Sequence, residues 1–178
     1  MTQKFEFELV FELPEGTHDP FALSDAVFEA GFEDAVIGTG NPRLLGIELE
    51  AEGDDAEEVI LSAARAIVRS LPEGSRLRET RPDLVSLSDV AEKLHIRRQA
   101  LQKRKEMPLP SVGGLYRIDE LADVLLAASE PREGRRAPRF DISASKGWFL
   151  AGLAARRINA LLTMEYIDPV SITRIGRR

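Results

Sequence analysis

The feature that most constrains the fold is a strict alternation of apolar and acidic side chains near the N-terminus. In the segment FEFELVFEL, residues 5–13, the alternating apolar positions are Phe5, Phe7, Leu9, Phe11 and Leu13, and the glutamates are Glu6, Glu8 and Glu12. Successive side chains of a β-strand point to opposite faces of the sheet, so this segment can bury one face and leave the other in water. The sequence therefore predicts a half-buried strand.

Helical and extended patterns follow this strand through residue 80. The expected elements are a helix over 19–30, a strand over 32–38, a strand over 45–50, a helix over 55–71 and a strand over 75–80. Asp19-Pro20 caps the first helix, and Gly40-Asn41-Pro42 is typical of a turn between strands. The order is that of ferredoxin-like domains, so we expect an α+β protein in which residues 1–80 form an acidic ferredoxin-like βαββα(β) domain. That fold indicates no particular function.

Two short helices joined by a tight turn are expected next. Ser86 begins the first helix, and the second runs from Arg97 to Lys105 after His95-Ile96. Side chains spaced to share one small core are Val90, Leu94, Ile96 and Leu101, and Ala91 is small where the helices must approach. This spacing is that of a helix-turn-helix, whose second helix enters the major groove of DNA.

The following residues predict a wing and a third helix. Pro108 and Pro110 end the second helix, Gly113-Gly114 closes a hairpin, and a helix runs over 119–128. The stretch SLSDVAEKLHIRRQALQKRKEMPLPSVGGLYRIDELADVL resembles the winged helix-turn-helix of the MerR and excisionase superfamily. Such domains have a VAEKL helix, an RQAL recognition helix, a PLP exit and a YRIDEL transition in this order. The resemblance implies a DNA-binding domain over residues 84–128.

The sequence departs from this family pattern at two positions. His95 stands in the turn where glycine is usual, although histidine adopts the left-handed conformation more often than most residues. Arg104 stands where relatives often carry a bulky apolar side chain. The recognition helix is therefore expected to end early or to pack differently, without losing its DNA-reading face.

The polar side chains of the second helix are expected to divide into two roles. Gln99, Gln102 and Lys103 project away from Leu101, and glutamine and lysine can hydrogen-bond base edges, so these three are the expected base-reading residues. The expected phosphate contacts are Arg97, Arg98, Arg104 and Lys105, and Arg117 in the wing is expected to reach the DNA backbone or minor groove. Cations in the first helical turn oppose the helix dipole by about 0.3–1 kcal/mol each, a cost that an anionic partner relieves.

The net charge of −6 conceals two oppositely charged halves. Residues 1–84 contain 7 Lys/Arg and 19 Asp/Glu, a net charge of −12, while residues 85–178 contain 17 and 11, a net charge of +6. The acidic part, residues 4–71, resembles small acidic bacterial modules that occur alone or ahead of DNA-binding domains. An alternative function therefore stays open: an antitoxin-like or adaptor protein whose acidic N-terminal domain binds a protein partner.

Other functional classes have no support in the residues. The chain has no cysteine, and His18 has no second His or Cys nearby, so we expect neither a metal site nor a cofactor. The strand glutamates have no partnering base, and neither a phosphate-binding loop nor a nucleophile elbow is present, so we expect no enzyme. No segment approaches 18 consecutive apolar residues and no signal peptide pattern is present, so we expect a cytoplasmic protein.

The C-terminal part is expected to be a helical extension, residues 139–178. It follows the Pro/Gly/Arg-rich joint PREGRRAP, residues 131–138, and its helix is expected over 141–163, although Gly147 and Gly152 disfavour one. Its apolar side chains include Trp148, Phe149, Leu153, Ile158, Leu161 and Leu162. We expect this face to pack on a second copy of the chain or, alternatively, on the N-terminal domain. The whole sequence thus predicts a homodimeric repressor of transcription that binds double-stranded DNA.

Overall fold

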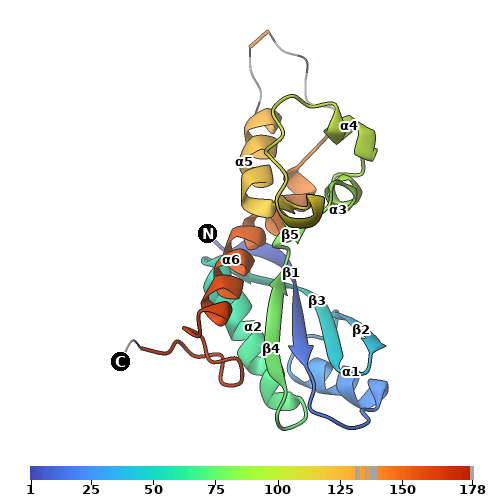
Figure 1. The fold of residues 1–178 in the computed structure, drawn as a ribbon, viewed down its shortest axis with the longest axis vertical. Coiled ribbons are helices and arrows are strands. Elements are labelled where there is room, and N and C mark those ends of the chain that lie inside the picture. Colours follow the sequence, from blue (N-terminus) through green and yellow to red (C-terminus); the bar gives the residue numbers. More distant parts are fainter. Residues whose placement is uncertain (131–132, 135, 137–139, 177–178) are drawn as a thin grey trace.

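The N-terminal part of the chain folds as a four-stranded antiparallel sheet packed against helices (Figure 1). The computed structural model describes residues 1–130, 133–134, 136 and 140–176. The first elements are β1 (Gln3–Glu12), α1 (Pro20–Glu29), β2 (Val36–Asn41), β3 (Leu44–Gly53), α2 (Ala56–Ser70) and β4 (Arg76–Arg81). The strands lie in the order β2-β3-β1-β4. The expected α+β class is confirmed, and we call residues 1–81 the sheet unit.

One strand begins later than its sequence pattern predicts. A strand is expected over 32–38, but β2 starts at Val36. The preceding residues form a turn in which the N–H of Ala35 donates to the carbonyl of Phe32 at 3.2 Å. Phe32 and Ala35 are apolar because they pack against the core, not because they alternate in a strand. A short apolar run therefore indicated burial correctly and secondary structure wrongly.

The alternation in β1 has the expected consequence. Phe7 and Phe11 are almost completely buried, and they lie opposite Leu49 and Leu45 of β3. The same register places Glu6 opposite Glu50 and Glu8 opposite Glu48 on the other face of the sheet.

Like charges directly opposite each other destabilise a pair of strands, and three cations offset this repulsion. Lys4 pairs with Glu50, and Arg81 of β4 lies 3.5 Å from Glu8. Lys93, from the following part of the chain, pairs with Glu6 and lies 3.7 Å from Glu48. The open face of the sheet is thus stabilised from elements distant in sequence.

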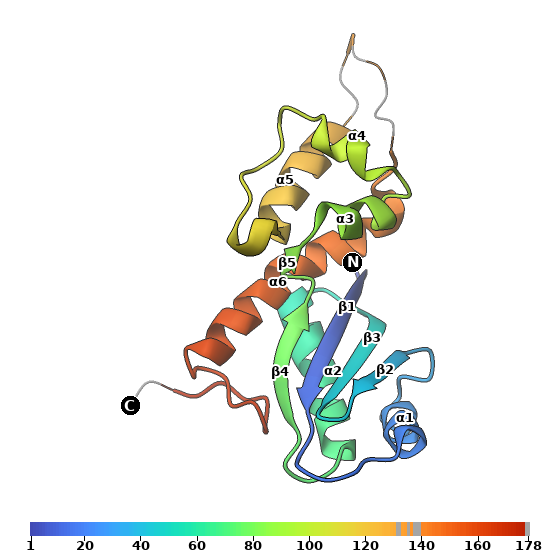
Figure 2. The same cartoon turned by 45° about the vertical axis from the view of Figure 1, so that its right-hand side comes forward.

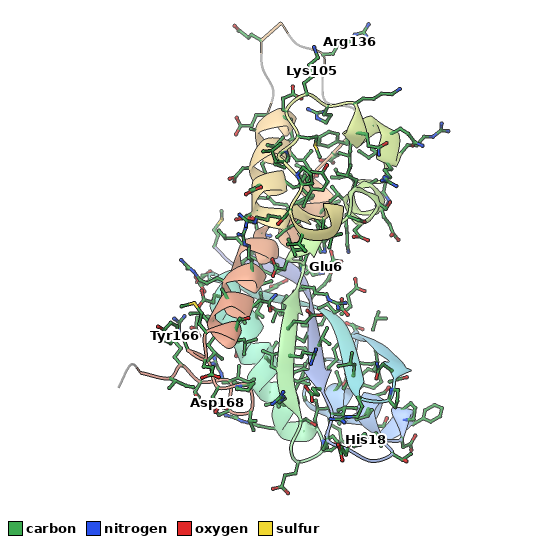
Figure 3. The ribbon with its side chains drawn as sticks, in the orientation of Figure 1. Glu6, His18, Lys105, Arg136, Tyr166 and Asp168 are labelled. Atoms are coloured by element: carbon green, nitrogen blue, oxygen red, sulfur yellow. The ribbon has the colours of Figure 1, made fainter. Side chains whose placement is uncertain are left out.

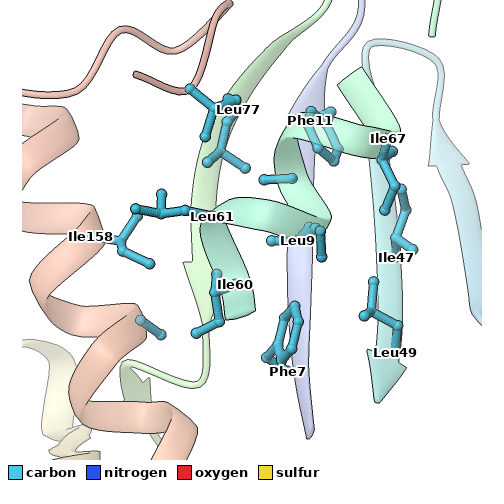
Figure 4. Packing of buried hydrophobic residues seen from close by; sticks show 14 of the residues in the cluster. Phe7, Leu9, Phe11, Ile47, Leu49, Ile60, Leu61, Ile67, Leu77 and Ile158 are labelled. Carbon is cyan, nitrogen blue, oxygen red and sulfur yellow. The ribbon is translucent and has the colours of Figure 1, made fainter. Parts of the chain in front are cut away.

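The long helix α6 (Lys146–Thr163) connects the two parts of the molecule (Figures 1 and 2). Helix α6 packs against β1, β4 and α2, and in its C-terminal half Ile158 joins Leu61 and Ile60 in the core of the sheet unit (Figure 4). Its N-terminal half contributes Trp148 and Phe149 to a second hydrophobic cluster. The apolar face of α6 is therefore buried within its own chain, which is closer to the alternative expectation than to packing on a second copy.

The glycines that disfavour a helix in the sequence permit this packing. A Cβ atom at Gly147 would clash with the carbonyl oxygen of Lys4, and one at Gly152 would clash with the side chain of Ile118. The absence of a side chain at each position lets α6 approach β1 on one side and the second cluster on another.

The outer edge of β4 is covered by the C-terminal part of the chain. The side-chain amide of Asn159 accepts a hydrogen bond from the N–H of Thr80 at 2.7 Å and donates to its carbonyl at 2.8 Å. Asn159 also donates to Asp83 at 2.9 Å. Further along the edge, the N–H of Leu77 donates to the carbonyl of Pro169 at 2.8 Å. One asparagine thus replaces a peptide group of a neighbouring strand and satisfies backbone groups that would otherwise lack partners.

The second cluster belongs to residues 84–129, which we call the α3–α5 unit, together with the start of α6. Its elements are β5 (Leu84–Val85), α3 (Leu87–Lys93), α4 (Arg98–Gln102), a 3₁₀ turn (Val112–Gly114), β6 (Tyr116–Arg117) and α5 (Ile118–Ser129). A 3₁₀ turn (Ser143–Ser145) precedes α6. Trp148 and Phe149 pack edge to face, with ring centroids 5.0 Å apart, and Phe140 and Ile142 join the same cluster. The expected joint at 131–138 lies mostly outside the described residues.

The strand pairing expected around Gly113-Gly114 is wrong, although the N–H of Ser111 donates to the carbonyl of Leu115 at 2.6 Å across the two glycines. β6 pairs with β5, with Leu84 opposite Arg117 and Val85 opposite Tyr116, and not with residues just before the glycines. The glycines have positive φ values of 65° and 74°, but they belong to a 3₁₀ turn. Pro108 and Pro110 explain the difference, because a residue without an N–H cannot donate to a strand ladder.

No helix among the described residues is long and apolar enough to cross a membrane.

Candidate nucleic-acid interface

The first helix of the α3–α5 unit is fixed at its start by a reciprocal cap. The hydroxyl of Ser86 accepts a hydrogen bond from the N–H of Asp89 at 3.1 Å, and the carboxylate of Asp89 accepts from the N–H of Ser86 at 2.8 Å. Such a capping box satisfies two backbone donors that have no partner inside the helix. The start of α3 is therefore where the sequence places it.

The turn between α3 and α4 contains His95 in the left-handed conformation, with φ of 52°. The N–H of His95 donates to Glu92 at 3.1 Å and the N–H of Ile96 donates to Ala91 at 3.0 Å. This pair of bonds is the Schellman arrangement that commonly ends a helix, usually with glycine at the left-handed position. His95 thus takes the conformation that glycine would take, and the chain turns sharply into α4.

Apolar side chains hold α4 against α3 and α5. Leu101 of α4 is completely buried, and it belongs to one cluster with Val90, Leu94, Leu121 and Leu125. Ala91 is also buried and Ile96 partly so, as expected from their spacing. With its buried side fixed by Leu101, α4 exposes its other side.

The exposed side of α4 carries the expected DNA-contacting side chains. Arg97, Arg98, Gln99, Gln102 and Lys103 are all exposed. Arg97, Gln99 and Lys103 line a shallow depression together with Ala100. The structure therefore brings two of the three base-reading candidates beside a phosphate-contact candidate on one surface.

The cations of this surface have no acidic partner in the described part of the chain. None of Arg97, Arg98, Lys103 and Lys105 forms an ion pair there, and no acidic residue lies in the first turn of α4. Lys105 lies at the same end of the molecule as Arg136 (Figure 3). This end of the molecule thus presents positive charge that is available to an anion.

Helix α4 is shorter than the expected 97–105. It ends at Gln102, where the N–H of Arg104 donates to the carbonyl of Leu101 at 3.0 Å and tightens the last turn. Arg104 then turns inward. Its guanidinium carbon lies 5.4 Å from the ring centre of Phe140, and its Nε, which is buried, lies 4.0 Å from a carboxylate oxygen of Glu106. Arg104 therefore packs against Phe140 inside the α3–α5 unit, and this position does not favour a phosphate contact.

Arg117 is exposed but has a partner. Its guanidinium lies 3.5 Å from a carboxylate oxygen of Glu120, one turn further along α5. Because β6 pairs with β5, Arg117 stands on the two-stranded sheet and not on a projecting hairpin. The contact with DNA that was expected for Arg117 requires a projecting hairpin, and Arg117 does not lie on one.

Sequence reasoning missed Lys93, which joins the two units. Besides its contacts with Glu6 and Glu48, its ammonium lies 5.7 Å from the ring centre of Trp148, and its carbonyl accepts a hydrogen bond from Ser145 at 2.6 Å. These residues line a cleft of about 870 Å³ between the sheet unit and α3. The only signal in the sequence was a lysine at the end of a short helix, which is common on solvated surfaces.

Other candidate sites receive no support from the geometry. His18 Nε2 lies 2.8 Å from the carbonyl of Pro14, within the same loop. The described residues contain no group of three or more His, Cys, Asp or Glu side chains that could hold a metal ion.

Comparisons with protein-family models, with curated proteins and with solved structures found no match for this chain.

Proposed function

We propose that the protein is a sequence-specific DNA-binding regulator whose α3–turn–α4 segment is a helix-turn-helix. The observation that carries the proposal is the exposed side of α4, where two glutamines and unpaired cations lie together on a helix fixed by buried Leu101. Cations position a protein on the phosphate backbone, and glutamine can read adenine in the major groove. This combination supports binding to duplex DNA more directly than the net positive charge of residues 85–178 does.

Further parts of the proposal concern architecture and mode of action. The element order and the strand order β2-β3-β1-β4 support a ferredoxin-like assignment for the sheet unit. The pairing of β5 with β6 beside α3 and α5 supports a variant of the winged helix-turn-helix in which a short two-stranded sheet replaces the projecting hairpin. We further propose that the protein acts as a homodimeric repressor by occupying a promoter, with half-sites about one helical turn apart.

The proposal is tested by selecting DNA sequences from a random duplex library with the full chain and measuring affinity for the selected site by fluorescence anisotropy. Gln99→Ala or Gln102→Ala should weaken binding to this site by about 1–3 kcal/mol and leave binding to random DNA unchanged. Arg97→Ala should weaken binding to both DNAs alike.

Gln3→Ala is the matched control, because Gln3 lies on β1 in the sheet unit. Equal affinity of the Gln99 and Gln102 variants and the parent for the selected site would contradict the role of α4. Failure of the library to enrich any sequence would favour the adaptor alternative. Sedimentation of the complex with one and two half-sites tests the dimer.

A further inference from the structure

The two sides of the sheet differ in how far their backbone groups are covered by other parts of the chain. The edge of β4 is covered by Asn159 and Pro169. At the other side, β2 pairs with β3 only as far as Glu48, which lies opposite Val36. Beyond Glu48, the strand partner of β3 is β1 alone among the described strands.

We call the side of Leu49–Gly53 that faces away from β1 the free edge of β3. No backbone hydrogen bond from this segment to a described residue exists outside its pairing with β1. Unpaired N–H and C=O groups along a strand are a template for the addition of another strand. The free edge is therefore able to accept an extended segment of about five residues.

An acidic groove follows the free edge. Its volume is about 480 Å³, and it is lined by residues 31–36 and 48–52 with Lys4 and Glu6. The acidic side chains among these residues are Glu6, Glu33, Asp34, Glu48, Glu50 and Glu52, and Lys4 is the one cation of the lining.

Half of these carboxylates have no cationic partner. Glu33, Asp34 and Glu52 are exposed and form no ion pair with the described residues. The pKa of Lys4 is raised above its ordinary value, chiefly by its hydrogen bond to Glu50 and in part by the negative charges of Glu52 and Asp34. The groove thus combines an open strand edge with uncompensated negative charge.

We propose that the free edge of β3 is a strand-addition site for an extended basic segment of a partner protein. The backbone of that segment pairs with Leu49–Gly53, and every second side chain lies on the face of the sheet that carries Glu48, Glu50 and Glu52. Lysine or arginine at these alternate positions faces the glutamates, and opposite charges on neighbouring strands are stabilising.

A second copy of this chain is a poor occupant of the same edge. Pairing the free edges of two copies would bring the glutamates of one β3 beside those of the other, and like charges on neighbouring strands are destabilising. The charge complementarity therefore selects a cationic partner, and the inference is independent of the role of α4 in DNA binding.

The probe is a fluorescein-labelled, acetylated and amidated peptide of seven residues that alternates lysine and valine. We expect it to bind the full chain, and we expect slower amide hydrogen exchange at residues 49–53 in the complex. The double variant Glu52→Lys with Asp34→Lys should raise the Kd about tenfold or more. Glu15→Lys with Glu73→Lys, an equal change of charge in the loops before α1 and β4, should leave the Kd unchanged, and circular dichroism reports whether each variant is folded.

A second peptide of the same sequence and charge, methylated on every backbone nitrogen, separates strand addition from attraction between charges. It has no N–H to donate to the carbonyl groups of β3, so this peptide should bind much more weakly. Equal binding of both peptides, or binding without protection of residues 49–53, would overturn the proposal in favour of a non-specific acidic surface. No binding would mean that the carboxylates only keep the edge from pairing. Protection that grows with protein concentration alone would assign the edge to a second copy.

Discussion

Three arginines of the sheet unit and two of the α3–α5 unit differ in what they contact. Arg43, Arg76 and Arg78 converge on the carboxylate of Glu12, with N–O distances of 3.3–3.4 Å. Arg97 and Arg98 have no such partner among the described residues. The presence or absence of a carboxylate partner, more than the net charge of a segment, therefore indicates where an anion can bind. The free cations lie beside polar side chains on α4, whereas the paired arginines stabilise strand ends.

The two units also differ in the size of the core that each builds from its own residues. The sheet unit buries the alternating face of β1 in a larger cluster, to which the C-terminal part of the chain adds Ala151, Ala154, Ala155, Ile158, Ile167 and Ile172. The α3–α5 unit has short helices and depends on Phe140, Ile142, Trp148 and Phe149 from the chain that follows it. The α3–α5 unit is therefore built on a smaller core that is completed from outside residues 84–129.

The largest loss of stability is expected when the contact of α6 with the core of the α3–α5 unit is removed. Phe149→Ala removes a side chain that is 1% exposed and should lower the free energy of unfolding by about 3–5 kcal/mol. Leu153→Ala, on the same helix, changes a side chain that is 60% exposed and should have an effect within about 0.5 kcal/mol. Urea denaturation of both variants measures the difference. A small loss for Phe149→Ala would show that the α3–α5 unit does not need α6.

Arginines with and without a carboxylate partner are expected to differ in their effect on the salt dependence of DNA binding. The double variant Arg97→Ala with Arg98→Ala should reduce the slope of log K against log salt by about 1.8, since each phosphate contact contributes about 0.9. Arg76→Ala with Arg78→Ala removes the same charge from the sheet unit and should leave the slope unchanged. Titrations of duplex DNA between 50 and 200 mM salt, over which the Debye length falls about twofold, give both slopes. Equal slopes for the two double variants would contradict the distinction between them.

A smaller effect is expected where α6 covers the edge of β4. Asn159→Ala leaves the N–H and carbonyl of Thr80 without their partner, and each unsatisfied buried group costs about 1–3 kcal/mol. Water that enters the space left by the side chain should keep the total loss near the lower end of this range. Asn41→Ala, at the exposed last residue of β2, is the control, because it removes an exposed hydrogen bond from the N–H of Arg43 and not a buried one. Thermal unfolding compares the two variants, and equal midpoints would mean that the edge needs no cover.

The smallest expected effect concerns the C-terminal segment. Backbone hydrogen bonds from Ser171 and Val170 lower the pKa of Asp168 below its ordinary value of 3.8. A carboxyl group with a lowered pKa stabilises the folded state above its ordinary pKa, and this stabilisation is lost as the pH falls through the pKa of the folded state. Asp168→Asn should therefore be slightly less stable than the parent at pH 7 and approach it near pH 3. Hydrogen exchange of residues 170–173 at both pH values checks the trend, and a constant difference between the two proteins would contradict it.

The sequence predicted well those features that depend on neighbouring residues. The alternation in β1, the cap at Ser86 and the turn at His95 each result from residues within a few positions of each other, and each appears as expected. The exposed side of α4 was also predictable, because one buried leucine fixes which side faces inward. In contrast, the apolar run at 32–38 indicated burial but did not show that its first residues form a turn. The glycine pair at 113–114 indicated a turn but did not show which strands pair beside it.

Residues close together in the sequence specify the alternation of β1, the capped start of α3 and the turn at His95. Contacts between distant residues specify that α6 packs on both units, that Arg104 turns toward Phe140, and that Lys93 offsets the glutamates of two strands. Apolar and charged side chains have no intrinsic preference for a particular partner. Burial and ion pairing stabilise whichever groups the folded chain brings together, and that choice depends on contacts between residues far apart in sequence.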